Sequence, residues 1–224
     1  MVEIELITYS KRMISSRLRV VALGDSLTAG LQTRSDLLYP SRWTPYTEFL
    51  EELARVHLAG TSSDLVVEVI NKGVCGDLTV DMLERFGKDV VEQQPAYVII
   101  LGGTNDVGWN LDSSIIVRNL KAMYDLAKSN RIEPVACAVP SILGFDDLIP
   151  ARLHLNDLVQ DEAERREIQF IDLFSATAEA DTNRLLERYS GDGIHLNAEG
   201  YQMLSQVIFQ QWLRPAIDGL ALSR

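Results

Sequence analysis

The chain has 224 residues, of which 46% are hydrophobic and 24% charged, the proportions of a globular domain rather than a fibrous or disordered protein. Its net charge of -11 argues against a nucleic acid partner, because binding to a phosphate backbone depends on Lys and Arg. The longest apolar runs, such as residues 97–101, are far too short to cross a bilayer, so we expect no integral membrane segment.

The cysteine content and the amino terminus bear on the cellular setting. The chain has only two cysteines, Cys75 and Cys137, too few for a disulfide framework and without the close spacing of a cysteine metal site. Residues 1–19 mix charged and apolar side chains and lack the continuous apolar stretch of a secretory signal. We therefore expect a reduced, cytoplasmic setting and no bound metal.

Residues 1–17 precede the first predicted strand of the core. The alternation of Val2, Ile4 and Leu6 fits either an added edge strand or a disordered lead-in, and the sequence leaves both open. No linker, repeat or low-complexity tract interrupts residues 18–224, which we expect to form a single domain.

Short apolar segments alternate with longer segments of helical periodicity, a pattern typical of βαβ units around a parallel sheet. The predicted strands are apolar throughout their middles, as strands buried on both faces should be, and comprise residues 18–23, 65–70, 97–101, 133–139 and 169–172. The predicted helices have apolar residues three and four positions apart and comprise residues 45–58, 79–93, 113–130, 150–166 and 198–213. Pro45 and Pro150 suit first turns, and Asn197 is a candidate N-cap.

Ligands of an open parallel sheet bind beyond the carboxyl ends of its strands, so the turns that follow the strands matter most. Unusual residues stand at these places. They are Gly-Asp-Ser-Leu at 24–27, Asn-Lys-Gly-Val-Cys-Gly-Asp at 71–77, Gly-Gly-Thr-Asn-Asp at 102–106 and, between the last strand and the last helix, Gly-Asp-Gly-Ile-His at 191–195.

Ser26 follows a strand at a tight glycine turn, where its hydroxyl can act as a nucleophile if a base removes the proton. His195 is the best candidate base, because His57 and His154 lie within predicted helices. Asp192, three positions before His195, can accept the Nδ1 proton and leave Nε2 free to take the proton of the serine.

Asn105 lies in a glycine-rich turn and supplies an amide donor. Together with the backbone N–H groups of Ser26 and Gly76, it can stabilise the negative charge that develops on an attacked carbonyl oxygen. Gly73 is an alternative to Gly76, which we favour because it stands just before Asp77 and the following helix.

These residues together resemble the sequence blocks of the GDSL, or SGNH, hydrolases. Residues 24–27 look like the first block and Gly76 like the glycine of the second. Residues 103–106 resemble the third-block Gly-x-Asn-Asp, and residues 192–195 resemble the fifth-block Asp-x-x-His. The resemblance extends from about residue 18 to about residue 213. The α/β-hydrolase motif Gly-x-Ser-x-Gly does not fit, because Thr28 stands where its second glycine belongs.

The resemblance implies a three-layer α/β/α, flavodoxin-like fold with a five-stranded parallel sheet, which would make residues 18–224 an SGNH hydrolase domain. It implies Ser26 as nucleophile, His195 as base and Asp192 as its orienting partner, with Ser26, Gly76 and Asn105 as oxyanion donors. It implies no cofactor. The expected activity is hydrolysis of small, short-acyl carboxylic esters through an acyl-enzyme.

Several neighbouring residues have simpler interpretations. We expect Asp25 and Asp106 to be structural rather than catalytic, and we interpret Cys75 as a small buried residue without a base of its own. Aromatic residues in nearby loops are candidates to line an acyl or alcohol pocket, namely Tyr39, Trp43 and Trp109.

Other activities share the same machinery and differ only in pocket shape. These are a thioesterase, a carbohydrate O-deacetylase and a lysophospholipase. A different class, a non-catalytic small-ligand-binding protein on a flavodoxin-like scaffold, is disfavoured because the first turn lacks a glycine-rich phosphate cradle.

Overall fold

The computed structural model describes residues 16–33, 41–61 and 63–222. Most of the predicted lead-in, residues 1–15, therefore lies outside the described residues, as does Tyr39. The choice between an added edge strand and a disordered lead-in stays a prediction.

A five-stranded parallel sheet forms the centre of the fold, as predicted. Its strands stand in the order β4-β1-β5-β6-β7, with bounds β1 Arg17–Gly24, β4 Val66–Gly73, β5 Tyr97–Leu101, β6 Glu133–Cys137 and β7 Gln169–Ile171. Residues 20–23 of β1 are completely buried, since helices cover both faces of the sheet. Gly24, at the end of β1, is in register with Gly73 of β4 and Leu101 of β5, which brings the turns after these strands together at one edge.

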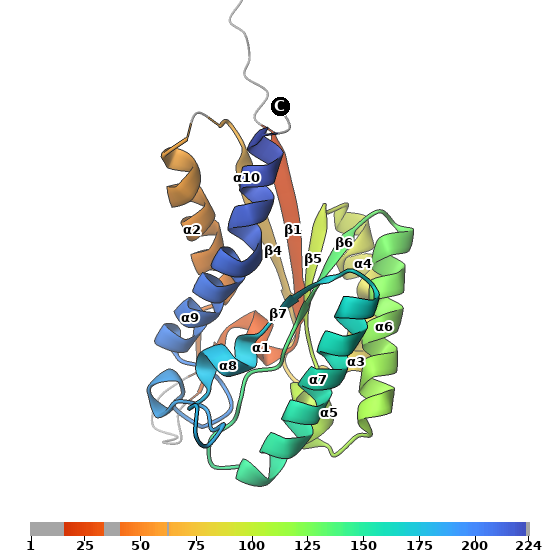
Figure 1. Cartoon of the computed structure of the whole chain (residues 1–224), viewed down its shortest axis with the longest axis vertical. Coiled ribbons are helices and arrows are strands. Elements are labelled where there is room, and N and C mark those ends of the chain that lie inside the picture. The colour runs from red at the N-terminus through yellow and green to blue at the C-terminus, as the bar shows by residue number, and fades with distance from the viewer. Residues whose placement is uncertain (1–15, 34–40, 62, 223–224) are drawn as a thin grey trace, which may run out of the picture.

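Helices pack on the two faces in separate layers (Figure 1). One layer contains α2 (Tyr46–Ala59), α9 (Ala198–Ile208) and α10 (Arg214–Leu222), and the other contains α3 (Thr79–Glu84), α6 (Ser113–Ser129) and α7 (Ile149–Arg165). Shorter helical elements are α1 Ser26–Ala29, α4 Phe86–Asp89, α5 Thr104–Gly108, α8 Leu173–Thr177, η1 Val91–Gln93, η2 Asp146–Leu148 and η3 Glu187–Tyr189. The strands β2 (Leu31–Gln32) and β3 (Arg42–Trp43) form a separate antiparallel pair. The predicted three-layer fold is confirmed.

The helix predicted over residues 79–93 is wrong as a single element, because it is broken into α3, α4 and η1. The first break falls at Arg85, whose backbone has φ -90° and ψ 0°. Its guanidinium turns toward the strand ends and donates to the carbonyls of Gly24 and Lys72, each at 2.9 Å. These tertiary contacts override the local helical periodicity.

The last helix extends beyond its predicted end at residue 213. A π-helical segment, Phe209–Leu213, leads into α10, where Pro215 falls in the first turn. Proline cannot donate the backbone hydrogen bond of a regular α-helical turn, and the adjoining π-helical segment lets the continuous helix accommodate this loss. Asp218 of α10 lies 2.7 Å from Nε2 of His57 in α2, which ties the added helix to its layer.

The predicted helix starts agree with the structure at two of three positions. Asn197 accepts a hydrogen bond from the backbone N–H of Gly200 at 3.0 Å and caps α9. Pro150 occupies the first turn of α7. Pro45 was predicted in a first turn but precedes α2 in an extended conformation, with φ -66° and ψ 138°.

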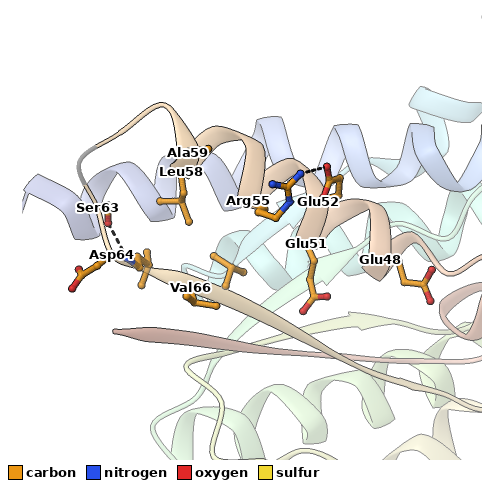
Figure 2. Close-up of a pocket in the computed structure, with 11 residues that line it drawn as sticks. Glu48, Glu51, Glu52, Arg55, Leu58, Ala59, Ser63, Asp64 and Val66 are labelled. Carbon is orange, nitrogen blue, oxygen red and sulfur yellow. Dashed lines mark hydrogen bonds and ion pairs between the residues drawn. The ribbon is translucent and has the colours of Figure 1, made fainter. Parts of the chain in front are cut away.

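A groove of about 580 Å³ separates α2 from the edge strand β4 (Figure 2). Its walls carry Glu48, Glu51 and Glu52, with Arg55 paired to Glu52, beside the apolar Leu58 and Val66. Because it lies at the amino end of β4, it is at the opposite end of the sheet from the turns that hold the candidate catalytic residues.

Candidate active site

Ser26 is placed by a tight connection between β1 and α1. The carboxylate of Asp25 caps α1 by accepting from the backbone N–H of Leu27 at 2.9 Å, so Ser26 begins the helix at the end of the sheet. A Cβ at position 24 would lie 2.2 Å from Oγ1 of Thr28 and 2.5 Å from the carbonyl oxygen of Leu101. Only glycine leaves room for this turn.

The structure brings the three predicted catalytic residues together. Nε2 of His195 lies 3.1 Å from Oγ of Ser26, although 169 positions separate them. On the other side of the ring, Nδ1 lies 2.8 Å from Oδ2 of Asp192. A carboxylate at Nδ1 favours the tautomer in which Nε2 accepts the hydroxyl proton.

The backbone around His195 holds the carboxylate in place. Oδ1 of Asp192 accepts from the backbone N–H groups of Ile194 at 2.9 Å and His195 at 2.8 Å. The hydroxyl of Ser190 accepts from the backbone of Gly193 at 2.8 Å and donates to the carbonyl of His195 at 2.6 Å. The three-residue spacing predicted the pairing of Asp192 with His195, and the structure adds hydrogen bonds from Ser190 that stabilise the same loop.

The two glycines considered for the oxyanion site differ in their surroundings. The N–H of Gly73 is engaged with Oδ1 of Asn71 at 2.9 Å, and a Cβ at this position would lie 2.1 Å from the backbone nitrogen of Ala29. Gly73 therefore serves close packing of β4 against α1. Gly76 has φ +85° and open space around its Cα, and its N–H bonds to no residue in the described part of the chain.

Asn105 and Asp106 tie the second and third turns to each other. Nδ2 of Asn105 donates to the carbonyl of Asp77 at 2.9 Å. The buried carboxylate of Asp106 accepts from the Thr79 hydroxyl at 2.6 Å and from the Thr79 backbone, and so holds the start of α3. These bonds fix the loop of Gly76 relative to Asn105, and the role they indicate for Asp106 is structural.

A model of the GDSL-like lipase/acylhydrolase family matches residues 22–203. The chain belongs to this family. Its members are carboxylic ester hydrolases, and the candidate nucleophile Ser26, base His195 and carboxylate Asp192 lie within the matched residues.

Individual relatives of this GDSL hydrolase are distant. It is 25% identical over 222 residues to the uncharacterized lipoprotein YqeF of Bacillus subtilis. That alignment covers 84% of this chain and 87% of YqeF. It is 24% identical over 200 residues to an arylesterase of Vibrio mimicus, covering 88% of each. It is 22% identical over 220 residues to an acetylxylan esterase of Geobacillus stearothermophilus, covering 90% of this chain and 98% of that protein. The crystal structure of that esterase superposes with a TM-score of 0.69 at 21% identity, over 88% of this chain and 95% of that one, and shows the same fold.

Thr33 is a residue of the GDSL hydrolase site that the sequence did not indicate. Its hydroxyl donates to Oδ2 of Asp192 and lies 3.3 Å from Nδ1 of His195. Burial by itself would raise the pKa of Asp192, but the hydrogen bonds from His195, Thr33 and the loop backbone hold this pKa well below its usual range. No motif singles out Thr33, because only folding brings residues 33 and 192 together.

Arg85 is a second residue without a sequence signal. Besides the carbonyls of Gly24 and Lys72, its guanidinium binds the carboxylates of Asp77 at 2.6 Å and Asp89 at 2.9 Å. It therefore joins the ends of β1 and β4 to the loop that contains Gly76. Its side chain is mostly buried behind the site, so this role is one of support.

A cavity of about 310 Å³ opens beside the candidate catalytic residues, and we call it the Asn105 cavity. Its walls are mainly apolar, with one buried arginine, and consist of Thr104, Asn105, Gly108, Trp109, Ile142, Phe145, Leu148, Arg152 and Ile194. Trp109 thus lines a pocket next to the site, as predicted. Trp43 lies on β3 with 59% of its surface exposed and does not line this cavity.

The interpretation of Cys75 as a buried residue is wrong, because its side chain is exposed in the turn before Gly76. The lack of a neighbouring base suggested a buried small residue, but the whole turn at residues 74–76 is exposed. Cys137 is buried, and both cysteines are free.

In the described part of the chain, no three His, Cys, Asp or Glu side chains converge in a way that could hold a metal ion. Nor is any helix of these residues long and apolar enough to cross a membrane.

Proposed function

We propose that this GDSL-family hydrolase cleaves small esters of short acyl chains through an acyl-enzyme on Ser26. The observation that carries the proposal is the continuous contact from the Ser26 hydroxyl through the His195 ring to the Asp192 carboxylate, at 3.1 Å and 2.8 Å. Each atom is within the reach that proton transfer requires.

In the first half of the proposed reaction, Oγ of Ser26 attacks the ester carbonyl while Nε2 of His195 takes the hydroxyl proton. The C–O bond to the alcohol then breaks, and the alcohol leaves with that proton. In the second half, water gives a proton to Nε2 and attacks the acyl carbonyl, which releases the acid and returns the proton to Ser26. Asp192 stays ionised throughout and balances the charge of the imidazolium, a role that suits its lowered pKa.

The proposed oxyanion donors are the backbone N–H groups of Ser26 and Gly76 and the side-chain amide of Asn105. The N–H of Gly76 has no partner among the described residues, which supports its assignment over Gly73, whose N–H is already engaged. One hydrogen of the Asn105 amide binds the Asp77 carbonyl, which leaves the other for substrate. Donors held in advance need no reorganisation when charge develops on the carbonyl oxygen.

The modest size of the Asn105 cavity, about 310 Å³, supports a short acyl or alcohol group rather than a long fatty chain. Removal of acetyl groups from carbohydrate is a second candidate function, favoured by the similarity to an acetylxylan esterase along 98% of that protein. A thioesterase and a lysophospholipase would use the same chemistry on other substrates. The experiment below therefore includes an acyl thioester and a lysophospholipid.

The test combines labelling with a substrate series. A fluorophosphonate probe is applied to wild type, Ser26→Ala and His195→Ala. The same three proteins are then assayed on p-nitrophenyl esters from acetate to dodecanoate, acetylated xylo-oligosaccharide, an acyl thioester and a lysophospholipid. We expect labelling of the wild type at Ser26 and the highest kcat/KM on acetate or butyrate. Ser26→Ala and His195→Ala should retain the fold, as measured by circular dichroism, and lose about 10³-fold or more in kcat.

The outcomes separate the alternatives. A preference for dodecanoate or lysophospholipid contradicts the short-acyl proposal and retains the nucleophile. Absence of labelling, with ester cleavage unchanged in Ser26→Ala, contradicts the proposed chemistry and favours a binding protein on this scaffold.

We also propose a reduced, cytoplasmic location, supported by the two cysteines, which are both free. The relative YqeF is by its name a lipoprotein. Fractionation of cells producing the full-length native protein tests the proposal, and recovery in the membrane fraction would contradict it.

A further inference from the structure

Arg152 places a buried positive charge in the wall of the Asn105 cavity. It belongs to α7, and only 2% of its surface is exposed. The surrounding wall is apolar, with Trp109, Phe145 and Leu148 among its members. A cation in such surroundings is costly unless it is paired and hydrogen-bonded.

The guanidinium of Arg152 is only partly satisfied by the protein. Nη1 donates to the carbonyl of Pro140 at 2.8 Å, whereas Nε is buried without a partner. No carboxylate of the described residues lies within 4.0 Å of it, the limit for an ion pair. Among described residues, therefore, neither Nε nor Nη2 has an acceptor.

The carboxylate that most stabilises the charged form of Arg152 is that of Asp25, the residue before Ser26. Burial lowers the pKa of Arg152 to about 10, and Asp25 opposes this shift, so the guanidinium is charged at neutral pH. Burial likewise raises the pKa of Asp25 to about 6. The two charges influence each other without contact, and the carboxylate of Asp25 is directed to the α1 backbone rather than to the arginine. Asp25 thus offsets the charge of Arg152 but does not occupy its donors.

We infer that the Asn105 cavity receives a substrate group that ends in a carboxylate, and that Arg152 binds this carboxylate. The apolar part of the group would pack against Trp109 and Phe145, while the carboxylate accepts hydrogen bonds from the guanidinium. Arginine suits this role because its donors match the two oxygens of a carboxylate. The inference rests on the proposed esterase function and defines its substrate class as esters with an acidic end.

The carboxylate could belong to either side of the scissile ester, and matched substrates distinguish the two. On the acyl side, the p-nitrophenyl monoester of adipic acid is compared with the p-nitrophenyl ester of adipic acid monoamide, in which an amide replaces the free carboxylate. On the alcohol side, 4-acetoxybenzoate is compared with 4-acetoxybenzamide. Within each pair the size is nearly constant and the charge differs, so the ratio of kcat/KM for acid over amide reports recognition of the anion.

The ratios are measured for wild type, Arg152→Met, Arg152→Lys and, as a matched control, Arg165→Met. Arg165 lies on the same helix, with 65% of its side chain exposed and an ion pair to Glu162. In the wild type we expect the acid to be preferred in one pair by about tenfold or more, the worth of a hydrogen bond to a charged group. Arg152→Met should abolish the preference, Arg152→Lys should retain part of it, and Arg165→Met should leave it unchanged.

A purely structural role for Arg152, such as balancing Asp25, would lower kcat/KM for acid and amide alike and leave their ratio unchanged. That result overturns the inference. Two results with the wild type would overturn it as well. One is equal cleavage of acid and amide in both pairs, and the other is cleavage of none of the four substrates while p-nitrophenyl acetate is hydrolysed. Failure on p-nitrophenyl acetate and on every other ester contradicts the proposed function itself. Because each ratio is internal to one protein, a partly destabilised variant still gives an answer.

Discussion

Thr33 and His195 contact the same carboxylate oxygen, Oδ2 of Asp192. The hydrogen bond from Thr33 favours the ionised form of the carboxylate, in line with the lowered pKa of Asp192. The proposed catalytic base is thus oriented by a residue from the beginning of the chain as well as by its own loop.

Substitution of Thr33 should therefore weaken catalysis without removing it. We expect Thr33→Val, which keeps the shape and loses the hydroxyl, to lower kcat on p-nitrophenyl acetate by about five- to tenfold, the effect of losing one hydrogen bond to a charged group in a partly buried site. Thr33→Ser retains the donor and should stay close to wild type. Equal activity of the Val and Ser variants would show that Thr33 does not support the carboxylate.

Asn105 should contribute mainly to the rate of the chemical step. Asn105→Ala removes a proposed oxyanion donor, and loss of one such donor typically lowers kcat by about 10²- to 10³-fold. KM should change little, because the hydrogen bond strengthens as charge develops. Asn130→Ala, at the exposed end of α6, is the control and should keep full activity. A large increase in KM with kcat unchanged would assign Asn105 to substrate binding instead.

Gly73 and Gly76 should respond to different extents to the same substitution. In Gly73→Ala the new Cβ would meet the backbone of Ala29 at 2.1 Å, and we expect a loss of about 3 kcal/mol or more in the free energy of unfolding. Gly76→Ala meets nothing and bears only the strain of φ +85°, about 1 kcal/mol, while its N–H is kept. Urea unfolding of both variants measures the difference, and equal losses would contradict these packing assignments.

Asp25 should make the folded state less stable as the pH rises. Burial raises its pKa from 3.8 to about 6, so between these values the folded protein holds a proton that the unfolded chain releases. Since the folded state then binds more protons, the contribution of Asp25 to the free energy of unfolding falls through this window. At pH 7 the carboxylate costs on the order of 2 to 3 kcal/mol.

Asp25→Asn tests this pH dependence, because the amide oxygen can still cap the N–H of Leu27 and carries no charge. The variant should be more stable than wild type at pH 7, and the difference should shrink toward zero near pH 4, where the wild-type carboxyl is protonated as well. Asp192 titrates in both proteins and cancels in the comparison. A difference that is constant from pH 4 to pH 7 would contradict the raised pKa of Asp25.

Local patterns predicted the strands closely and the broken helix poorly. A strand buried on both faces must be apolar throughout, so the segment at residues 97–101 is visible in the sequence and coincides with β5. The apolar spacing of residues 79–93 is equally regular, yet the guanidinium of Arg85 breaks the helix to bind strand-end carbonyls of β1 and β4. Periodicity records which side chains are buried and contains no information about such long-range bonds.

The sequence by itself determined the fold class, and it singled out Ser26, Asp192, His195, Asn105 and Gly76 as candidate site residues, because each belongs to a short motif at the end of a predicted element. Only the tertiary structure decided that the N–H of Gly73 is engaged, that Thr33 supports Asp192 and that Arg152 faces the cavity beside Asn105. These three depend on contacts between residues that are remote in sequence or on the space around a backbone atom. Such contacts come into existence only when the chain packs, and they leave no periodic or spaced pattern to be read beforehand.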